Sequence, residues 1–157
     1  MTIIATNSGG TIAALRSAEK LAANLGASIA LVKAQLIPFE FPLEAPPVSS
    51  DFLQRQLYGL VSEARIEFER ISVHLWPCRD RFVALRKILR PRSLVVIGGK
   101  KRWWSREKAL ERFLCQMGHQ VVFIDPGATG SSETRSNRWS GSAIPVLNQG
   151  VARRDRE

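Results

Sequence analysis

Apolar residues follow two patterns along this chain. Short unbroken runs rich in β-branched residues occupy 2–6, 28–33, 71–75, 94–97 and 120–124. Such runs are typical of strands in a parallel sheet, with the run at 71–75 alternating enough to suggest an edge strand with one wetter face. Runs with helical spacing lie between them. A strand, a helix and a strand joined by short connections predict parallel strands with right-handed crossovers.

The first two helices have clear start and stop signals. The first follows a turn at 7–10 and ends at Gly26, a residue suited to the left-handed conformation after a helix. The second begins at Asp51, with Gln54 three residues later as in a capping box. Its apolar stripe extends to Phe68.

The other two helices are shorter. Trp76-Pro77-Cys78 is expected to end the third strand, and a helix over 82–89 is stopped by Pro91. Ser105 caps the fourth helix, which closes at Gly118. Five strands alternating with four helices predict an α/β fold, a three-layer doubly wound five-stranded parallel sheet.

Two segments fall outside this alternation. Four prolines between residues 38 and 50 predict an extended surface loop, either a lid or a simple connector. Residues 127–157 are dominated by glycine, serine, asparagine and arginine, which predicts a flexible tail or one that docks on a partner. The folded domain is therefore expected over residues 1–126.

The positive charge is concentrated in one segment. The chain carries a net charge of +9, and residues 79–112 hold twelve cations against three acids, so the remainder is neutral overall. An anionic partner or a solvated basic face would explain this distribution equally well.

Part of a small-molecule site is expected where the strand at 94–97 ends. Gly98 and Gly99 are followed by three cations and a helix start, and open α/β sheets bind ligands at the carboxyl ends of their strands. The carboxyl end of the first strand is expected to face the same crevice. The residues predicted to contact a ligand are Thr6, Asn7, Ser8, Gly9, Gly98, Gly99, Lys100, Lys101, Arg102, Arg106 and Lys108.

Four stretches resemble the universal stress protein family over residues 1–126. They are Ile-Ile-Ala-Thr-Asn-Ser at 3–8, Leu-Ala-Ala-Asn-Leu-Gly-Ala-Ser-Ile-Ala-Leu at 21–31, Ser-Leu-Val-Val-Ile-Gly at 93–98, and the last helix and strand at 110–124. The resemblance implies strand order 3-2-1-4-5 and a cytoplasmic binding or regulatory protein. It also implies a homodimer paired through the last strand, at Val121, Val122, Phe123 and Ile124.

The sequence departs from the family members that hold ATP. Their motif Gly-x2-Gly-x9-Gly-Ser/Thr cradles phosphates with backbone amides and a helix N-terminus. Here Gly98 fits the first glycine, Lys101 replaces the second, and no Gly-Ser pair follows in the region near Glu107-Lys108. Thr6 replaces the acidic residue that contacts the nucleoside. The chain thus resembles the branch of the family that lacks a conventional ATP site. This resemblance implies that the protein has no cofactor. The alternative is ATP, AMP or another phosphate anion held by lysine and arginine.

Two further readings remain open. Trp103 and Trp104 lie within the basic segment and would allow stacking on nucleic-acid bases, although no known DNA- or RNA-binding motif surrounds them. Ser8-Gly9-Gly10-Thr11 resembles part of the pyrophosphate-binding loop of adenylating enzymes, but Ile12-Ala13 replaces the Asp-Ser of that loop.

Catalytic chemistry has little support in the sequence. His74 and His119 lie apart, and no nucleophile–base pair or metal cluster is visible, so no catalytic residue, metal or enzymatic activity is predicted. Cys78 and Cys115 are expected to be free thiols, which suits a reducing cytoplasm. No apolar run approaches the ~20 residues of a membrane span.

Overall fold

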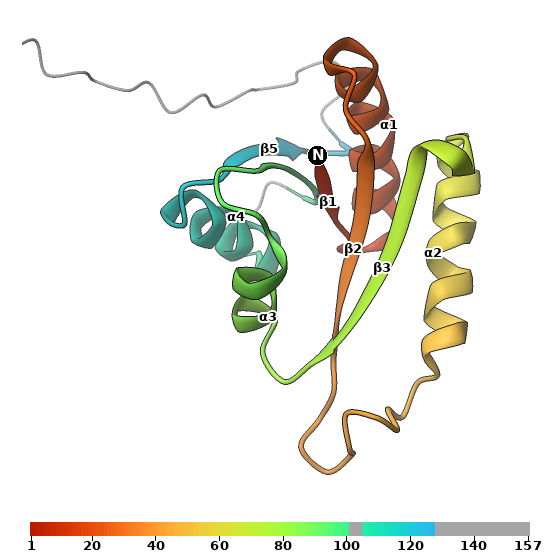
Figure 1. Cartoon of the computed structure of the whole chain (residues 1–157), viewed down its shortest axis with the longest axis vertical. Helices are drawn as coiled ribbons and strands as arrows, with labels where there is room; N and C mark the ends of the chain where they lie inside the picture. Colours follow the sequence, from red (N-terminus) through yellow and green to blue (C-terminus); the bar gives the residue numbers. More distant parts are fainter. Residues whose placement is uncertain (101–104, 128–157) are drawn as a thin grey trace, which may run out of the picture.

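The computed structural model describes residues 1–100 and 105–127 and confirms the predicted alternation of five strands and four helices (Figure 1). A short 3-10 helix, η1, precedes the third strand. The elements are β1 (Thr2–Ile4), α1 (Ser8–Leu25), β2 (Ile29–Leu36), α2 (Ser50–Ala64), η1 (Phe68–Arg70), β3 (Ile71–Cys78), α3 (Arg81–Ile88), β4 (Leu94–Gly98), α4 (Arg106–Gln116) and β5 (Gln120–Ile124).

All five strands form one parallel sheet. Its order is β3-β2-β1-β4-β5, as predicted, and every neighbouring pair is parallel. β1 lies at the centre, where Ile4 is opposite Val32 of β2 and Ile97 of β4. The carboxyl ends of β1 and β4 are therefore side by side, which is the condition for the predicted common site.

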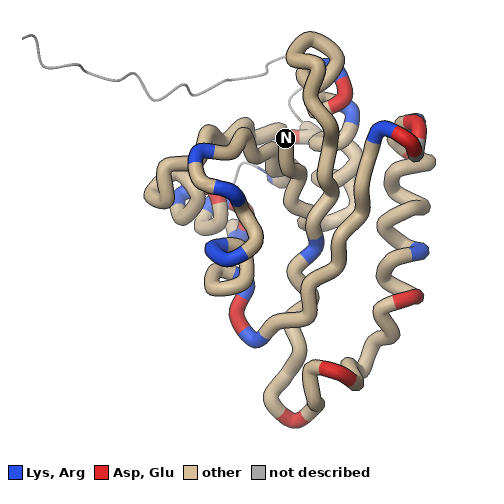
Figure 2. Tube along the Cα trace, viewed as in Figure 1, with Lys and Arg blue, Asp and Glu red and all other residues tan. Residues whose placement is uncertain are grey.

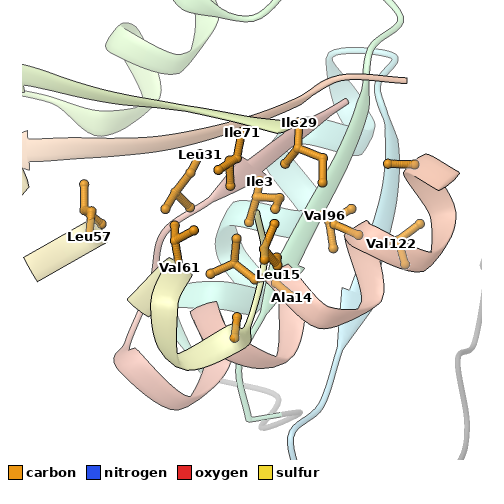
Figure 3. Close-up of a cluster of buried hydrophobic side chains, with 14 residues drawn as sticks. Ile3, Ala14, Leu15, Ile29, Leu31, Leu57, Val61, Ile71, Val96 and Val122 are labelled. Atoms are coloured by element: carbon orange, nitrogen blue, oxygen red, sulfur yellow. The ribbon is translucent and has the colours of Figure 1, made fainter. Parts of the chain in front are cut away.

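Helices cover both faces of the sheet. α1 and α2 pack on one face, where Ile3, Leu31 and Val96 belong to one buried cluster (Figure 3). α3 and α4 pack on the other face, over Ile4 and Ile97. Consecutive strand residues point to opposite faces, so a strand buried on both sides must be apolar at nearly every position. This is why unbroken apolar runs identified the strands.

The junction between β1 and α1 differs from the prediction. The first strand ends at Ile4 rather than Thr6, and Ser8, Gly9 and Gly10 form the first turn of α1 instead of a separate turn. Asn7 is the N-cap, and its side-chain oxygen accepts a hydrogen bond of 2.8 Å from the Gly10 amide. Because a capping side chain satisfies an amide that has no partner within the helix, the helix can begin directly after the strand.

β2 and β3 are longer than expected. β2 continues to Leu36 and β3 continues through Trp76-Pro77 to Cys78, with Pro77 opposite Gln35. The prediction that proline ends the third strand was wrong because β3 is an edge strand. A proline on an edge removes no ladder hydrogen bond when its nitrogen faces away from the neighbouring strand.

α2 also has different ends from those predicted. It starts at Ser50 after the N-cap Ser49, which makes no side-chain capping hydrogen bond, so Asp51 lies inside the first turn and does not cap the helix. At the other end Arg65 adopts a left-handed conformation with φ 62°. The helix therefore stops before Phe68, which begins η1.

The proline-rich segment is an irregular loop, as predicted, and one arginine holds it in place. The Arg79 guanidinium donates to the carbonyl oxygens of Ile37 (3.0 Å), Pro38 and Phe41 (2.8 Å), and it lies 5.1 Å from the centre of the Phe39 ring. Acidic residues lie along this loop, whereas cations gather on α3 and α4 (Figure 2). Arg79, although part of the basic segment, therefore serves to hold this loop.

Candidate functional site

A cavity of about 300 Å³ opens at the carboxyl edge of the sheet, on the side covered by α3 and α4. Ile4, Leu85 and Leu110 supply apolar lining, and Thr6 and Asn7 contribute polar groups from the β1–α1 junction. Residues from β1, β2, α3 and α4 converge here. A larger depression of about 510 Å³ is lined by Asp51, Gln54, Arg55 and Tyr58, all of which belong to α2. Because ligand sites in such sheets lie at strand ends, the first cavity is the better candidate.

Among the described residues, three with cationic side chains line the cavity, each from a different element. Lys33 comes from β2, Arg81 is the first residue of α3, and Arg106 is the first residue of α4. The N-terminus of each helix also carries a partial positive charge. Among the described residues of the lining, Glu107 is the one acidic residue, so these residues together carry a formal charge of plus two.

Beside the cavity, the backbone at the end of β4 is in close contact with the backbone at the start of α1. The Thr6 hydroxyl donates to the Gly98 carbonyl over 2.5 Å. A Cβ added at Gly98 would lie 1.7 Å from the Gly10 carbonyl oxygen. The Thr6 amide in turn donates to the hydroxyl of Thr11, which is fully buried. These contacts hold the start of α1 against the end of β4.

Glu107 connects the β1–α1 junction to α4. Its Oε1 atom accepts a hydrogen bond of 3.3 Å from Asn7 Nδ2. Its side chain also lies directly over Gly99, where an added Cβ would be 2.6 Å from the Glu107 Cγ atom. Ser105 caps this helix by accepting from the Lys108 amide at 3.1 Å, as predicted.

The predicted ligand residues separate into three groups. Thr6, Asn7 and Arg106 line the cavity. Ser8, Gly9 and Lys100 are exposed, whereas Gly98 and Gly99 are buried against backbone and against Glu107. Lys108 contacts Glu111 at 2.5 Å and lies 4.9 Å from the centre of the Phe123 ring, so its ammonium has partners outside the cavity lining. Lys101 and Arg102 lie outside the described residues.

Sequence reasoning missed Lys33 and Arg81 as site residues. Lys33 is the only charged residue in β2, and it follows Val32, which is opposite the last residue of β1. Arg81 follows Asp80, whose side chain caps α3 by accepting from the amides of Phe82 and Val83. The available signal for Lys33 was its position as the last residue of the strand predicted over 28–33.

The remaining reactive groups lie outside this cavity. Buried His119 hydrogen-bonds through Nδ1 to the Ser93 hydroxyl at 3.0 Å, and desolvation lowers its pKa. Burial and the nearby Asp80 carboxylate raise the pKa of the Cys78 thiol, against a smaller opposing effect of Arg81. Exposed His74 contacts Ser72. Within residues 1–100 and 105–127 no three His, Cys, Asp or Glu side chains are grouped to hold a metal ion.

Comparisons with known proteins find similarity in solved structures alone. No family model matches the chain, and no curated protein matches it. A universal stress protein crystallised with cAMP is 13% identical, with a TM-score of 0.48, and the match covers 80% of this chain and 97% of that one. A universal stress protein family member from Burkholderia pseudomallei is 18% identical, with a TM-score of 0.46, and the match covers 78% and 94% of the two chains.

In the part of the chain that the structure describes, no helix is both long enough and apolar enough to cross a membrane.

Proposed function

We propose that this chain is a non-catalytic binding protein with a universal stress protein-like fold, and that its cavity holds a small phosphate-bearing anion. The observation that carries this proposal is the presence of Lys33, Arg81 and Arg106 in the lining of one cavity beside the carboxyl end of β1. Cationic residues and helix N-termini gathered around one volume favour an oxyanion there.

The mode of holding differs from a glycine-rich phosphate loop. Gly99 is covered by the Glu107 side chain, and Gly98 gives its carbonyl to the Thr6 hydroxyl. The Gly99 amide donates to the Ile124 carbonyl at 2.9 Å and is therefore already used. The ligand is accordingly held by charged side chains rather than by backbone amides. ATP and AMP are candidates only as carriers of phosphate.

Calorimetric titration of the full chain with pyrophosphate, AMP and ATP at low ionic strength tests this function. Arg81→Glu reverses one cavity charge and is expected to weaken binding at least about tenfold, since a unit charge close to an anion is worth more than about 1.4 kcal/mol at partly buried sites. Lys87→Glu is the matched control, because Lys87 is an exposed cation on the same helix outside the cavity. Equal losses in both variants would contradict a site in the cavity.

We also propose that two copies pair through β5, which has the outermost position in the sheet beside β4. Val121 and Val122 are buried within their own chain, whereas Phe123 and Ile124 are partly exposed. Antiparallel pairing of β5 with the β5 strand of a second copy would cover Phe123 and Ile124 in each copy. The apolar character of the strand supports this pairing. Sedimentation at micromolar concentration is expected to give a dimer mass, and Ile124→Lys is expected to shift it towards the monomer. A wild-type monomer would contradict the pairing.

Nucleic-acid binding through residues 79–112 is less well supported. Arg79 is committed to the proline-rich loop, and Lys108 to Glu111. Arg86 lies 5.9 Å from the centre of the Phe113 ring. Trp103 and Trp104 lie outside the described residues. A basic surface that bound nucleic acid would lose affinity steeply with salt, which a titration at two salt concentrations would detect.

Residence in the cytoplasm remains part of the proposal.

A further inference from the structure

We infer that Glu107 is the resident anion of the cavity and sets its affinity for phosphate. This inference rests on the proposed binding function and adds one mechanism to it. A ligand phosphoryl group must move the Glu107 carboxylate aside or share the cations with it. Glu107 is thus a specificity-determining residue that disfavours anions at this edge of the sheet.

The contacts of Glu107 place it where a ligand's negative charge would otherwise lie. Its side chain covers Gly99, the residue that follows the end of β4. It accepts from Asn7, the N-cap of α1, at 3.3 Å. It belongs to the first turn of α4, directly after Arg106. A carboxylate at this point lies beside the N-termini of α1 and α4, which would also attract a phosphate group.

The neighbouring carboxylate on the same helix behaves differently. Glu111 is bound to Lys108 at 2.5 Å and is not part of the cavity lining. Both glutamates lie on α4 and are partly buried. Their neutralisation therefore changes the net charge of the protein equally, and only Glu107 changes the charge inside the cavity.

A favourable interaction of Glu107 with the dipole of α4 does not by itself explain where the Glu107 side chain lies. An acidic residue in the first turn of a helix is stabilised by the helix dipole wherever its side chain points. Here the side chain reaches across to Asn7, one hundred positions away in the sequence, and covers a glycine where a Cβ would approach it at 2.6 Å. A helical role predicts a change in stability, whereas the resident-anion role predicts a change in anion affinity.

Calorimetric titration with inorganic pyrophosphate separates these roles. The full-length wild type, Glu107→Gln and Glu111→Gln are compared at one ionic strength, with thermal unfolding recorded for each. Glutamine keeps the length of the side chain and an oxygen for Asn7 while removing the charge. Glu107→Gln is expected to bind pyrophosphate about tenfold more tightly than the wild type, and Glu111→Gln is expected to match the wild type.

Each outcome has a definite meaning. Wild-type affinity in folded Glu107→Gln, with measurable binding in the wild type, would overturn the resident-anion role and leave the binding function intact. Equal tightening in both variants would also overturn it, because net charge would then be the cause. Absence of pyrophosphate binding in all three proteins would overturn both proposals. Glu107→Ala, which also removes the charge, repeats the comparison if the glutamine variant does not fold.

Discussion

Gly10 and Gly98 meet backbone to backbone, one in the first turn of α1 and the other at the end of β4. A Cβ added at Gly98 would lie 1.7 Å from the Gly10 carbonyl oxygen, and one added at Gly10 would lie 2.4 Å from the Gly98 carbonyl oxygen. No side chain fits between the two backbones. This contact fixes the distance between the carboxyl ends of β1 and β4 and therefore the position of Thr6 and Asn7 at the cavity.

Gly98→Ala is expected to destabilise the protein by about 3 kcal/mol, because backbone must move to admit the methyl group. Gly59→Ala is the matched control. Gly59 lies in α2 with open space at its Cβ position, so alanine there is expected to stabilise the helix by about 0.5–1 kcal/mol. Urea unfolding of both variants measures the two changes. A Gly98→Ala variant as stable as the wild type would show that the two backbones are not in fixed contact.

Arg79→Ala is expected to release the proline-rich loop. The substitution removes the guanidinium that binds the carbonyls of Ile37, Pro38 and Phe41. Limited proteolysis should then cut within residues 38–48 several times faster than in the wild type. Arg79→Lys retains the charge but loses the planar set of donors, so it should give an intermediate rate. Unchanged cleavage in Arg79→Ala would mean that other contacts hold the loop.

His119 is expected to make the stability depend on pH below neutrality. Burial lowers its pKa in the folded protein, whereas in the unfolded chain a histidine titrates near about 6.5. As the pH falls below about 6.5 the unfolded chain binds a proton that the folded chain binds less readily, so stability decreases.

Urea midpoints at pH 8 and pH 5.5 measure this effect. The decrease between the two pH values should be smaller in His119→Gln than in the wild type. His74→Gln is the control, because His74 is exposed, and it should keep the wild-type dependence. A His119→Gln variant with the full wild-type decrease would assign the pH dependence to other groups.

The sequence predicted the fold because parallel strands buried on both faces must be continuously apolar. Val95, Val96 and Ile97 are each fully buried, and Gly26 ends α1 in the left-handed conformation expected of a glycine at that position. Boundaries failed where tertiary position overrides local preference. Pro77 is tolerated because β3 lies at an edge of the sheet.

The site was predicted in part for a similar reason. Thr6, Asn7 and Arg106 were found because they follow recognisable strand ends or helix starts. Lys33 was missed although the predicted strand order already put the second strand beside the first. Arg81 was missed because the third helix was predicted to begin at residue 82. Glu107 was recognised only as a departure from a glycine motif. Its contact with Asn7 joins residues one hundred positions apart, which spacing along the chain does not reveal.

The most direct test of an anion site in this cavity is an amide chemical-shift titration of the full chain with pyrophosphate. Saturable shifts are expected to gather at Thr6, Asn7, Ala34, Arg81 and Glu107, which lie in the β1–α1 junction and on β2, α3 and α4 and come together only in the folded protein. Shifts confined to exposed cations outside the cavity, such as Lys87 and Arg90, or no saturable shifts at all, would contradict it.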